Sequence, residues 1–247
     1  MTNVLFVTLD QFRGDTMSCA GHPLVRTPHL DALARRGVRF ARHYAQTSPC
    51  GPGRASLYTG TYLMNHRVVG NGTPLDARFD NLALVARRAG YRPALFGYTD
   101  TTVDPRLVDD ADDPRLESYE GVLPGFDPVL LLVDDHMPWR RWLEEQGHDP
   151  HRSAHEALAT ESTRPAEVSL SAFTTDRVIE WIDRQDAPWF AHVSYLRPHP
   201  PYDAAGEFAT WYDPADVPDP IAPVEGLHPL HQQLLAHPQL RSPGADA

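Results

Sequence analysis

The segment NVLFVTLDQ, residues 3–11, indicates the fold class of this chain. It contains a short run of apolar and β-branched side chains, which is typical of a buried strand in a parallel sheet. The polar pair Asp10 and Gln11 follows directly. Because α/β folds place their sites at the carboxyl ends of parallel strands, we expect a functional site at this point.

The following hundred or so residues alternate between helical and strand patterns. Thr27 and Pro28 open a helical pattern that Gly37 ends. Further expected elements are a strand over 38–44, a helix that begins at or just after Cys50, a helix over 81–89 and a strand over 91–98. This β-α-β-α-β order predicts an α/β fold with a doubly wound, mostly parallel sheet flanked by helices.

The second half of the chain is less regular. Residues 100–165 are rich in Asp and Pro and predict an irregular loop excursion with one helix over 138–146. An amphipathic helix over 171–185 and a strand over 188–196 follow. We expect the apolar stripe of that helix to contain Phe173, Val178, Ile179 and Ile182. Residues 203–247 form a Pro-rich tail in which we expect only a short helix after His228.

Charge and composition exclude several classes of partner. The chain has 22 Lys and Arg against 33 Asp and Glu, for a net charge of −11, which argues against nucleic acid or an anionic membrane. No apolar run approaches the roughly 18 residues of a membrane span, and the start lacks the pattern of a signal peptide. Two cysteines do not suggest a disulfide framework, so we expect a reducing, cytoplasmic setting. An anionic substrate would need a local cluster of positive charge or a metal.

The stretch SPCGPGRASLYTG, residues 48–60, places Cys50 at the start of a helix, with Arg54 four positions later. Helix N–H groups and a guanidinium both lower a thiol pKa and form an anion site, so an acidic thiol is expected. A cysteine phosphatase would need Arg six positions after Cys, but residue 56 is Ser. The spacing of Cys19, His22, His43 and Cys50 gives only weak support for a metal site. An inert buried cysteine in a turn is the ordinary alternative.

The pattern Cys50, Pro52, Arg54, followed by ASLYTG, resembles the signature of the sulfatase family. In that family the cysteine is oxidised to formylglycine, whose hydrated aldehyde attacks sulfate or phosphate esters. The flanking motifs NVLFVTLDQFRGD, YLMNHR, GNGTPLD, FGYTDTT and RPHPPY occur in the family's order. They most resemble the phosphonate monoester hydrolases, with the arylsulfatases next. The resemblance covers essentially the whole chain and implies an alkaline-phosphatase-like fold.

The resemblance also implies roles for single residues. Cys50 would be the nucleophile after modification, Arg54 would stabilise charge, and His199 would contact the substrate or act as acid or base. A divalent metal (Ca, Mn or Mg) would be held by Asp10, Gln11 and the modified Cys50, with Gln11 replacing the usual second Asp. The residues expected to line the substrate pocket are Asn71 and Tyr98. Two places after Tyr98 the family pattern expects Thr, but this chain has Asp100, which should repel an anionic ester.

The family's site has a second half, which consists of an Asp-His pair and a later Lys. The chain's one Asp-His dipeptide, Asp135-His136, lies in the wrong region and precedes Met-Pro. Residues 1–247 are therefore expected to be an incomplete N-terminal portion of a sulfatase-type catalytic domain, with weak metal binding.

Three functions remain open from the sequence. The first is a hydrolase of sulfate, phosphate or phosphonate monoesters that depends on a formylglycine-generating enzyme. The second is an inactive fragment, or one subunit of a split enzyme, that acts by assembly with a complementing C-terminal half or a second copy. The third is a thiol enzyme that uses unmodified Cys50.

Overall fold

The computed structural model describes residues 1–219 and 226–236. It divides into two compact units, residues 1–211 and residues 212–247. The first unit contains the following strands and α-helices: β1 (Val4–Leu9), α1 (Pro28–Arg36), α2 (Cys50–Thr59), α3 (Leu63–His66), α4 (Leu82–Arg88), β2 (Ala94–Gly97), β3 (Asp127–Leu131), α5 (Met137–Glu145), α6 (Ala154–Leu158), α7 (Leu170–Ile182) and β4 (Phe190–Tyr195). The second unit contains α8 (Pro229–Ala236). None of the described helices is long and apolar enough to cross a membrane.

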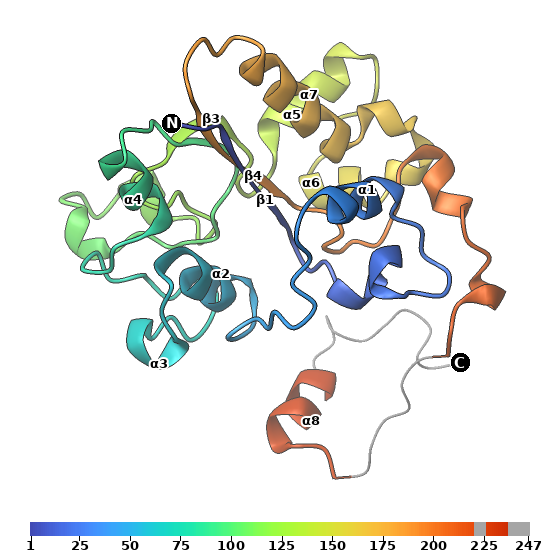
Figure 1. Ribbon diagram of the computed structural model, residues 1–247, viewed down its shortest axis with the longest axis horizontal. Helices are drawn as coiled ribbons and strands as arrows, with labels where there is room; N and C mark the ends of the chain where they lie inside the picture. Colours follow the sequence, from blue (N-terminus) through green and yellow to red (C-terminus); the bar gives the residue numbers. More distant parts are fainter. Residues whose placement is uncertain (220–225, 237–247) are drawn as a thin grey trace. The chain divides into compact units, whose positions relative to one another are not determined.

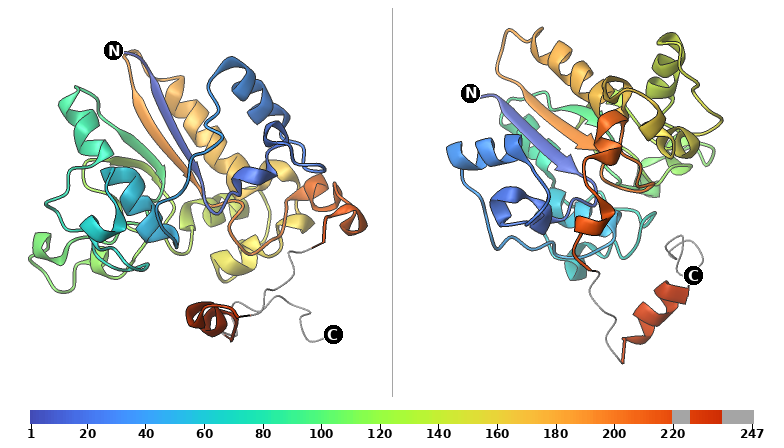
Figure 2. Two further views of the ribbon diagram at one scale, coloured as in Figure 1. Left: turned by 60° about the horizontal axis from the view of Figure 1, so that its bottom comes forward. Right: turned by 90° about the vertical axis from the view of Figure 1, so that its right-hand side faces the viewer.

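The four described strands form one parallel sheet in the order β1-β4-β2-β3 (Figure 1). The two strands that are farthest apart in sequence, β1 and β4, pair along their full length and run side by side in both views of Figure 2. Because all four strands are parallel, their carboxyl ends meet at one edge of the sheet. This confirms the predicted fold class and brings the residues that follow β1, β2 and β4 to the same edge.

Alternating side chains of the central strands pack against different helices. Leu95 and Phe190 belong to a buried cluster that also contains residues of α2 and α4: Ala55, Tyr58, Ala83 and Ala86. Their sequence neighbours Phe96 and Ala191 pack instead with Val178 of α7. This period of two is the one expected of a sheet with helices on both faces.

A third buried cluster joins the helices of residues 137–182. It contains Leu132, Trp139, Leu143, Ala154, Ala157, Leu158, Leu170 and Phe173. The expected stripe on α7 is correct for Phe173 and Val178, which are buried, but Ile179 is wrong, since 51% of its surface is exposed. The packing face of α7 is therefore narrower than the sequence predicted.

The expected strand over 38–44 is absent from the structure, and all seven of these residues are exposed. Val38 is 80% exposed and Phe40 78% exposed, although their apolar side chains alternate with charged ones. An alternating pattern forms a strand only when a neighbouring strand pairs with it. No described strand pairs with this segment, so it is a loop between α1 and α2.

Residues 100–165 contain more regular structure than the single helix that the sequence predicted. That helix is present as α5, but strand β3 and helix α6 were not expected. Pro128 lies inside β3, and Pro is usually a signal against a strand. β3 is an edge strand of the described sheet, where a missing N–H group is tolerated.

Candidate active site

The carboxyl edge of the sheet gathers residues from three strands. Asp10 follows β1, Tyr98 follows β2, and His199 lies four residues after β4. The Asp10 N–H group donates to the Tyr195 carbonyl at 3.0 Å, so the pairing of β1 with β4 continues one residue beyond the strand. Gln11 then has a φ of 57°, in the left-handed region, and the chain turns away from the sheet. The parallel sheet thus brings together the residues at which the sequence predicted a site, as expected from its topology.

Cys50 is the first residue of α2, as the sequence predicted. The next N–H group of the helix, that of Gly51, donates to Asn71 Oδ1 at 2.9 Å. A Cβ atom at Gly51 would lie 3.2 Å from the same oxygen, so this close approach favours glycine. Asn71, which was expected to line the substrate pocket, thus positions the helix that carries Cys50.

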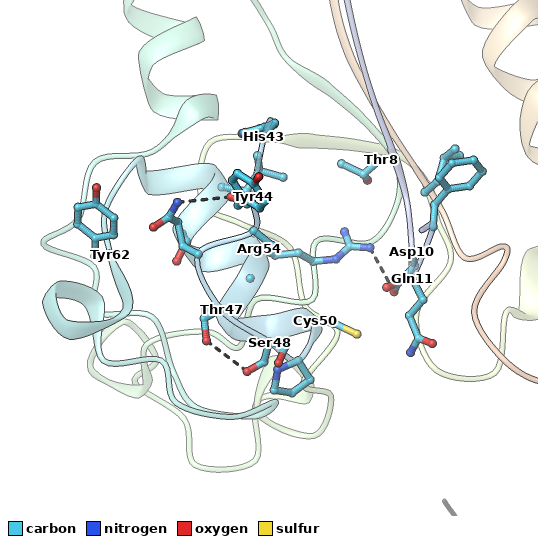
Figure 3. Close-up of a pocket in the computed structure, with 18 of the residues that line it drawn as sticks. Thr8, Asp10, Gln11, His43, Tyr44, Thr47, Ser48, Cys50, Arg54 and Tyr62 are labelled. Carbon is cyan, nitrogen blue, oxygen red and sulfur yellow. Dashed lines mark hydrogen bonds and ion pairs between the residues drawn. The ribbon is translucent and has the colours of Figure 1, made fainter. Parts of the chain in front are cut away.

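Arg54 lies one helical turn after Cys50 on the same side of α2 and points toward the sheet edge (Figure 3). It is only 7% exposed. One terminal nitrogen, Nη1, donates to Ser194 Oγ at 2.8 Å and to the Tyr58 hydroxyl at 3.2 Å. The other, Nη2, lies 3.4 Å from Asp10 Oδ2, and the guanidinium carbon sits 4.8 Å from the centre of the Tyr98 ring. These contacts hold the positive charge in one place.

Two carboxylates lie close to the Cys50 side chain. The Tyr98 hydroxyl donates to Asp10 Oδ2 at 2.7 Å, and Asp100 is 5% exposed with one oxygen 3.9 Å from Arg54 Nε. Ligand atoms of Asp10, Cys50 and Asp100 all lie within 4.8 Å of one another. The structure therefore brings together two buried carboxylates and the half-buried Cys50 from the ends of β1 and β2 and the start of α2.

The environment of Cys50 contradicts the predicted acidic thiol. Burial, followed by the negative charges of Asp10 and Asp100, raises the pKa of the Cys50 thiol to about 12, and the Arg54 charge opposes this only in part. The prediction was wrong because it considered only the helix N-terminus and Arg54. Burial of the thiol has the largest effect, and the charges of the two carboxylates, which come from distant parts of the chain, each outweigh that of Arg54. An unmodified Cys50 is therefore a poor nucleophile near neutral pH.

The pKa values of the neighbouring groups also reflect burial. Burial raises the pKa of Asp100 to about 6, although the charges of Arg54 and His199 oppose this shift. Burial likewise raises the pKa of Tyr98, whose hydroxyl therefore remains protonated and donates to Asp10. The site thus holds a neutral phenol, a neutral thiol and two carboxylates around one guanidinium.

His199 lies on the loop after β4, between the cis peptide bonds Arg197–Pro198 and Pro200–Pro201. Its Nδ1 lies 2.8 Å from the Pro200 carbonyl, which can only accept a hydrogen bond, so Nδ1 carries the proton. In the neutral ring this leaves Nε2 as an acceptor. His199 lowers the pKa of Asp100 in part, so this loop lies within electrostatic range of that carboxylate.

A pocket of about 1060 Å³ opens beside these residues. Its lining includes four of the predicted site residues, namely Asp10, Gln11, Cys50 and Arg54, and it also includes Tyr62 and the loop residues 43–49 (Figure 3). Of the segment that was expected to form a strand, only His43 and Tyr44 line this pocket. Cys50 and Arg54 point from α2 toward Asp10 and Gln11 on the opposite side.

The sequence missed two residues that hold Arg54. Ser194 lies within the predicted last strand, but strand periodicity gives no sign that it binds a guanidinium. Tyr58 follows Arg54 by four positions on α2, and that spacing could have predicted the contact. Its hydroxyl also lies 2.9 Å from His192 Nε2, which links Arg54 to the centre of the sheet.

Comparison with known proteins identifies the family of this chain. The sulfatase family model matches residues 2–221, which is most of the chain. The chain belongs to the sulfatase family. This family match and the parallel sheet together confirm the resemblance that the motifs suggested.

Two solved structures of this family are similar to the chain over most of its length. The phosphonate monoester hydrolase of Agrobacterium radiobacter is 49% identical, with a TM-score of 0.83 over 89% of this chain and 45% of that one. The phosphonate monoester hydrolase of Silicibacter pomeroyi is 41% identical, with a TM-score of 0.79 over 92% and 47%. These similarities confirm the alkaline-phosphatase-like sulfatase fold.

A curated relative, the multifunctional alkaline phosphatase superfamily protein PehA of Trinickia caryophylli, is 37% identical over 95% of this chain and 50% of its own length. The choline-sulfatase of Rhizobium meliloti is 27% identical over 94% and 44%. The chain thus spans about half the length of the sulfatase-family relatives that it matches.

Proposed function

We propose that this chain provides the nucleophile-bearing part of a hydrolase of sulfate, phosphate or phosphonate monoesters. One observation carries the proposal: Cys50 begins α2 with Arg54 one turn later, and both face Asp10 at the carboxyl edge of the sheet. In the sulfatase family this cysteine is the residue that becomes formylglycine, through the action of a formylglycine-generating enzyme. The similarity to two phosphonate monoester hydrolases supports phosphorus esters alongside sulfate esters.

The environment of Cys50 favours a modified side chain over a thiolate. Burial and the two carboxylates disfavour a thiolate at Cys50, which argues against a thiol enzyme. A hydrated aldehyde at this position would instead offer neutral hydroxyl groups, and these can donate hydrogen bonds to a carboxylate. Asp10 lies within reach of such a group.

The donor set at the sheet edge fits a divalent metal of the Mg, Ca or Mn type. These ions prefer carboxylate, amide and hydroxyl oxygen ligands, and Asp10, Gln11 and a modified Cys50 would supply one of each. The Tyr98 hydroxyl and Arg54 both contact one oxygen of Asp10, which fixes the orientation of the carboxylate. When bound, the ion would lower the pKa of a coordinated hydroxyl and offset the charge of the ester.

Arg54 and the start of α2 are the groups of this chain that would bind the anionic part of the ester. The guanidinium is already held by Ser194, Tyr58 and Asp10, so it needs no rearrangement when charge develops. The helix N-terminus adds a positive partial charge on the same side. His199, with Nε2 free to accept, would exchange a proton with the substrate or with the leaving group.

The proposal is tested by coexpressing the chain with a formylglycine-generating enzyme. Mass spectrometry of the peptide that contains Cys50 would reveal an aldehyde in place of the thiol. Hydrolysis of p-nitrophenyl sulfate and of a p-nitrophenyl phosphonate is then measured, with Cys50→Ala as the test variant and Cys19→Ala as the control. We expect Cys50→Ala to lose hydrolysis and Cys19→Ala to retain it.

Two results would overturn this proposal. If Cys50 stayed an unmodified thiol in the presence of the modifying enzyme, the formylglycine assignment would be wrong. If Cys50→Ala hydrolysed the esters as fast as the parent chain, the nucleophile would be another residue. Because the chain spans half of its relatives, the same pair of variants is also compared in the presence of the polypeptide that its relatives carry beyond this region.

Assembly with another polypeptide segment is a second candidate function, and strand β1 favours it. β1 is an edge strand of the described sheet, and on it Leu5 is 51% exposed and Val7 45% exposed. Apolar side chains on an edge strand favour pairing or packing with further polypeptide. We propose that the segment corresponding to the uncovered half of the relatives packs here, and that a second copy of the chain is the competing occupant.

Light scattering distinguishes these occupants. The chain is mixed with the uncovered half of the Agrobacterium relative, and a 1:1 complex is expected. A Leu5→Lys/Val7→Lys variant should lose that complex while retaining its circular dichroism spectrum. A dimer of the chain alone would favour the second copy, and a monomer under both conditions would contradict an assembly function.

A further inference from the structure

We infer that Asp100 is a direct ligand of the divalent cation at this site. The inference rests on the proposed function, because that function requires a cation beside Asp10. It goes further by giving a role to a residue at which the sequence departs from the family pattern. In that pattern a threonine is expected, and the carboxylate at this position was expected only to repel an ester.

The first observation is the position of Asp100. One of its carboxylate oxygens lies within 4.8 Å of a ligand atom of Asp10 and of the Cys50 side chain. Asp10 directly follows β1, Cys50 begins α2 and Asp100 lies three residues after β2, so no local turn accounts for their meeting. A single ion placed among three such atoms could contact all of them.

The second observation is that Asp100 has an unsatisfied oxygen. The residue is only 5% exposed, and Oδ1 has no hydrogen-bond partner in the described structure. Leaving a buried carboxylate oxygen without a partner is costly, and such atoms in native proteins usually bind water or an ion. This oxygen belongs to the same carboxylate that lies close to Asp10 and Cys50, so a cation bound there could satisfy it.

Charge in the site leads to the same conclusion. Two carboxylates, Asp10 and Asp100, face one guanidinium, that of Arg54. Arg54 already donates to Ser194 and to the Tyr58 hydroxyl, and its contact with Asp100 is 3.9 Å, too long for a hydrogen bond. The buried group therefore has an excess negative charge that its own residues do not compensate. A divalent cation bound by both carboxylates would reverse this excess and make the site attractive to an ester anion.

The backbone at Asp100 holds its side chain in this position. Its φ of 54° lies in the left-handed region, which Asp tolerates better than most residues. The Asp100 N–H group donates to the Glu120 carbonyl at 2.8 Å, which ties the turn to the neighbouring loop. The carboxylate therefore does not need to move into the site when a cation arrives.

The test measures cation binding directly rather than hydrolysis. Mn²⁺ and Ca²⁺ are titrated calorimetrically into the purified 247-residue chain near pH 8, where carboxylates are ionised. The variants are Asp10→Asn, Asp100→Asn and Asp100→Thr, with the exposed Asp112→Asn as a control for the loss of one charge. We expect Asp100→Asn and Asp100→Thr to weaken binding by about tenfold or more, as changes around metal sites commonly do. Asp112→Asn should change it by less than about twofold, because its field is screened.

The outcomes separate this inference from the proposed function. If Asp10→Asn abolished binding and both Asp100 variants bound as tightly as the parent chain, Asp100 would not be a ligand, although the cation site would stand. If the parent chain bound neither ion, both the cation site and the role of Asp100 would be wrong.

A crystal grown with Ca²⁺ gives an independent measurement. An ion within about 2.6 Å of an Asp100 oxygen would support the inference, because that is the usual limit of a Ca–O bond. An ion bound to Asp10 with Asp100 out of ligand range would overturn it. The distance also excludes an indirect effect of the Asp100 variants through Arg54.

Discussion

At the scale of single residues, Arg54 connects most of the site. Its guanidinium donates to Asp10, which follows β1, to Ser194 in β4, and to Tyr58 in its own helix. A buried cation with this many fixed partners holds the nearby carboxylate in place, and under the proposed function it would also supply positive charge to the ester. Changes in its partners should therefore alter both folding stability and ligand binding.

Tyr98→Phe tests one of these links. The substitution retains the ring under Arg54 but removes the hydroxyl that donates to Asp10 at 2.7 Å. We expect the free energy of unfolding in urea to fall by about 1–2 kcal/mol, since a buried hydrogen bond to a carboxylate is lost. Tyr202→Phe, at an 82% exposed position, is the matched control and should leave stability unchanged. Equal stability of the two variants would contradict the role given to the Tyr98 hydroxyl.

His192 predicts a pH dependence of stability. Burial lowers its pKa from 6.5 to about 4 in the folded chain. As pH falls below 6.5 the unfolded chain binds a proton that the folded chain does not, so stability is lost until about pH 4. The loss is about 3 kcal/mol, from roughly 1.4 kcal/mol for each unit of pKa.

A His192→Gln variant lacks this titration. Its unfolding free energy should therefore fall less than that of the parent chain between pH 7 and pH 4, whatever its absolute stability. His155→Gln, at an exposed position, serves as the control and should follow the parent curve. Parallel curves for His192→Gln and the parent would show that the imidazole does not drive the acid sensitivity.

Single-residue roles were only partly predictable from the sequence. The motif around Cys50 identified Arg54, and the end of the first strand identified Asp10, because short-range spacing determines both. The raised pKa of Cys50 was not predictable, since it depends first on burial and then on the carboxylates of Asp10 and Asp100, all of which arise only in the folded chain. Asn71 was assigned to the pocket, but its amide holds the start of α2.

At the scale of elements, the end of β2 approaches β4 unusually closely. Gly97 has a φ of 102°, and a Cβ atom there would lie 2.2 Å from the Ser194 carbonyl oxygen. Only glycine avoids this overlap while adopting the required backbone conformation. The close approach places Tyr98 and Asp100 next to the strand that carries the Ser194 hydroxyl.

Gly97→Ala should therefore lower the free energy of unfolding much more than the same substitution at another glycine with a positive φ. We expect a loss of at least about 2–3 kcal/mol in the free energy of unfolding, because strain and overlap add. Gly60→Ala is the control: its φ is 67° but a Cβ atom there meets nothing within 4 Å, so a loss of about 1 kcal/mol is expected. Similar losses for both variants would mean that backbone conformation alone, and not the contact with β4, requires glycine at position 97.

Sequence patterns identified the elements that are themselves strongly apolar or whose contacts lie close in the chain. β1, β4, α2 and α7 were expected within a few residues of their bounds. The segment 38–44 was wrongly expected to be a strand, because alternation does not reveal whether a pairing partner exists. β3 was missed for the opposite reason: its edge position tolerates Pro128, which sequence reasoning treats as a strand breaker.

At the scale of the whole molecule, an ion pair joins the helical layer to the loop that carries His199. Arg197 donates to Glu161, which is only 2% exposed, and Glu161 also accepts from the Leu170 N–H group at the start of α7. Arg197 further donates to the carbonyls of Leu158 and His199. One side chain thus connects α6, α7 and the end of β4.

Arg197→Met should loosen this connection. It leaves the Glu161 carboxylate buried without its partner, which costs about 3–5 kcal/mol in the free energy of unfolding. Arg177→Met, which breaks the half-exposed pair with Glu180, should cost less than about 1 kcal/mol. In the Glu161→Gln background the Arg197→Met substitution should cost less, since no buried charge is stranded. Independent, additive effects of the two changes would contradict the pairing.

The overall architecture could be predicted from the sequence. The position of Asp100 in the site could not be predicted from local patterns. The family motifs occur along the chain in order, and the parallel sheet brings their ends together as expected. The inward-facing Asp100 differs, because its significance depends on an oxygen left without a partner in the folded state. Only the folded structure shows this carboxylate beside Asp10 and Cys50, where the proposed cation would bind.

The burial of the motif around Cys50 has a consequence for the timing of synthesis. The Pro52 side chain is fully buried and Arg54 is 7% exposed once α2 has packed against the sheet. A modifying enzyme that had to contact Pro52 or Arg54 while it oxidised Cys50 could not reach them in the finished fold. Conversion would have to precede packing, so the fraction of converted molecules would depend on a race between folding and oxidation. Slower translation would then yield more of the aldehyde form, and refolding from denaturant would yield none.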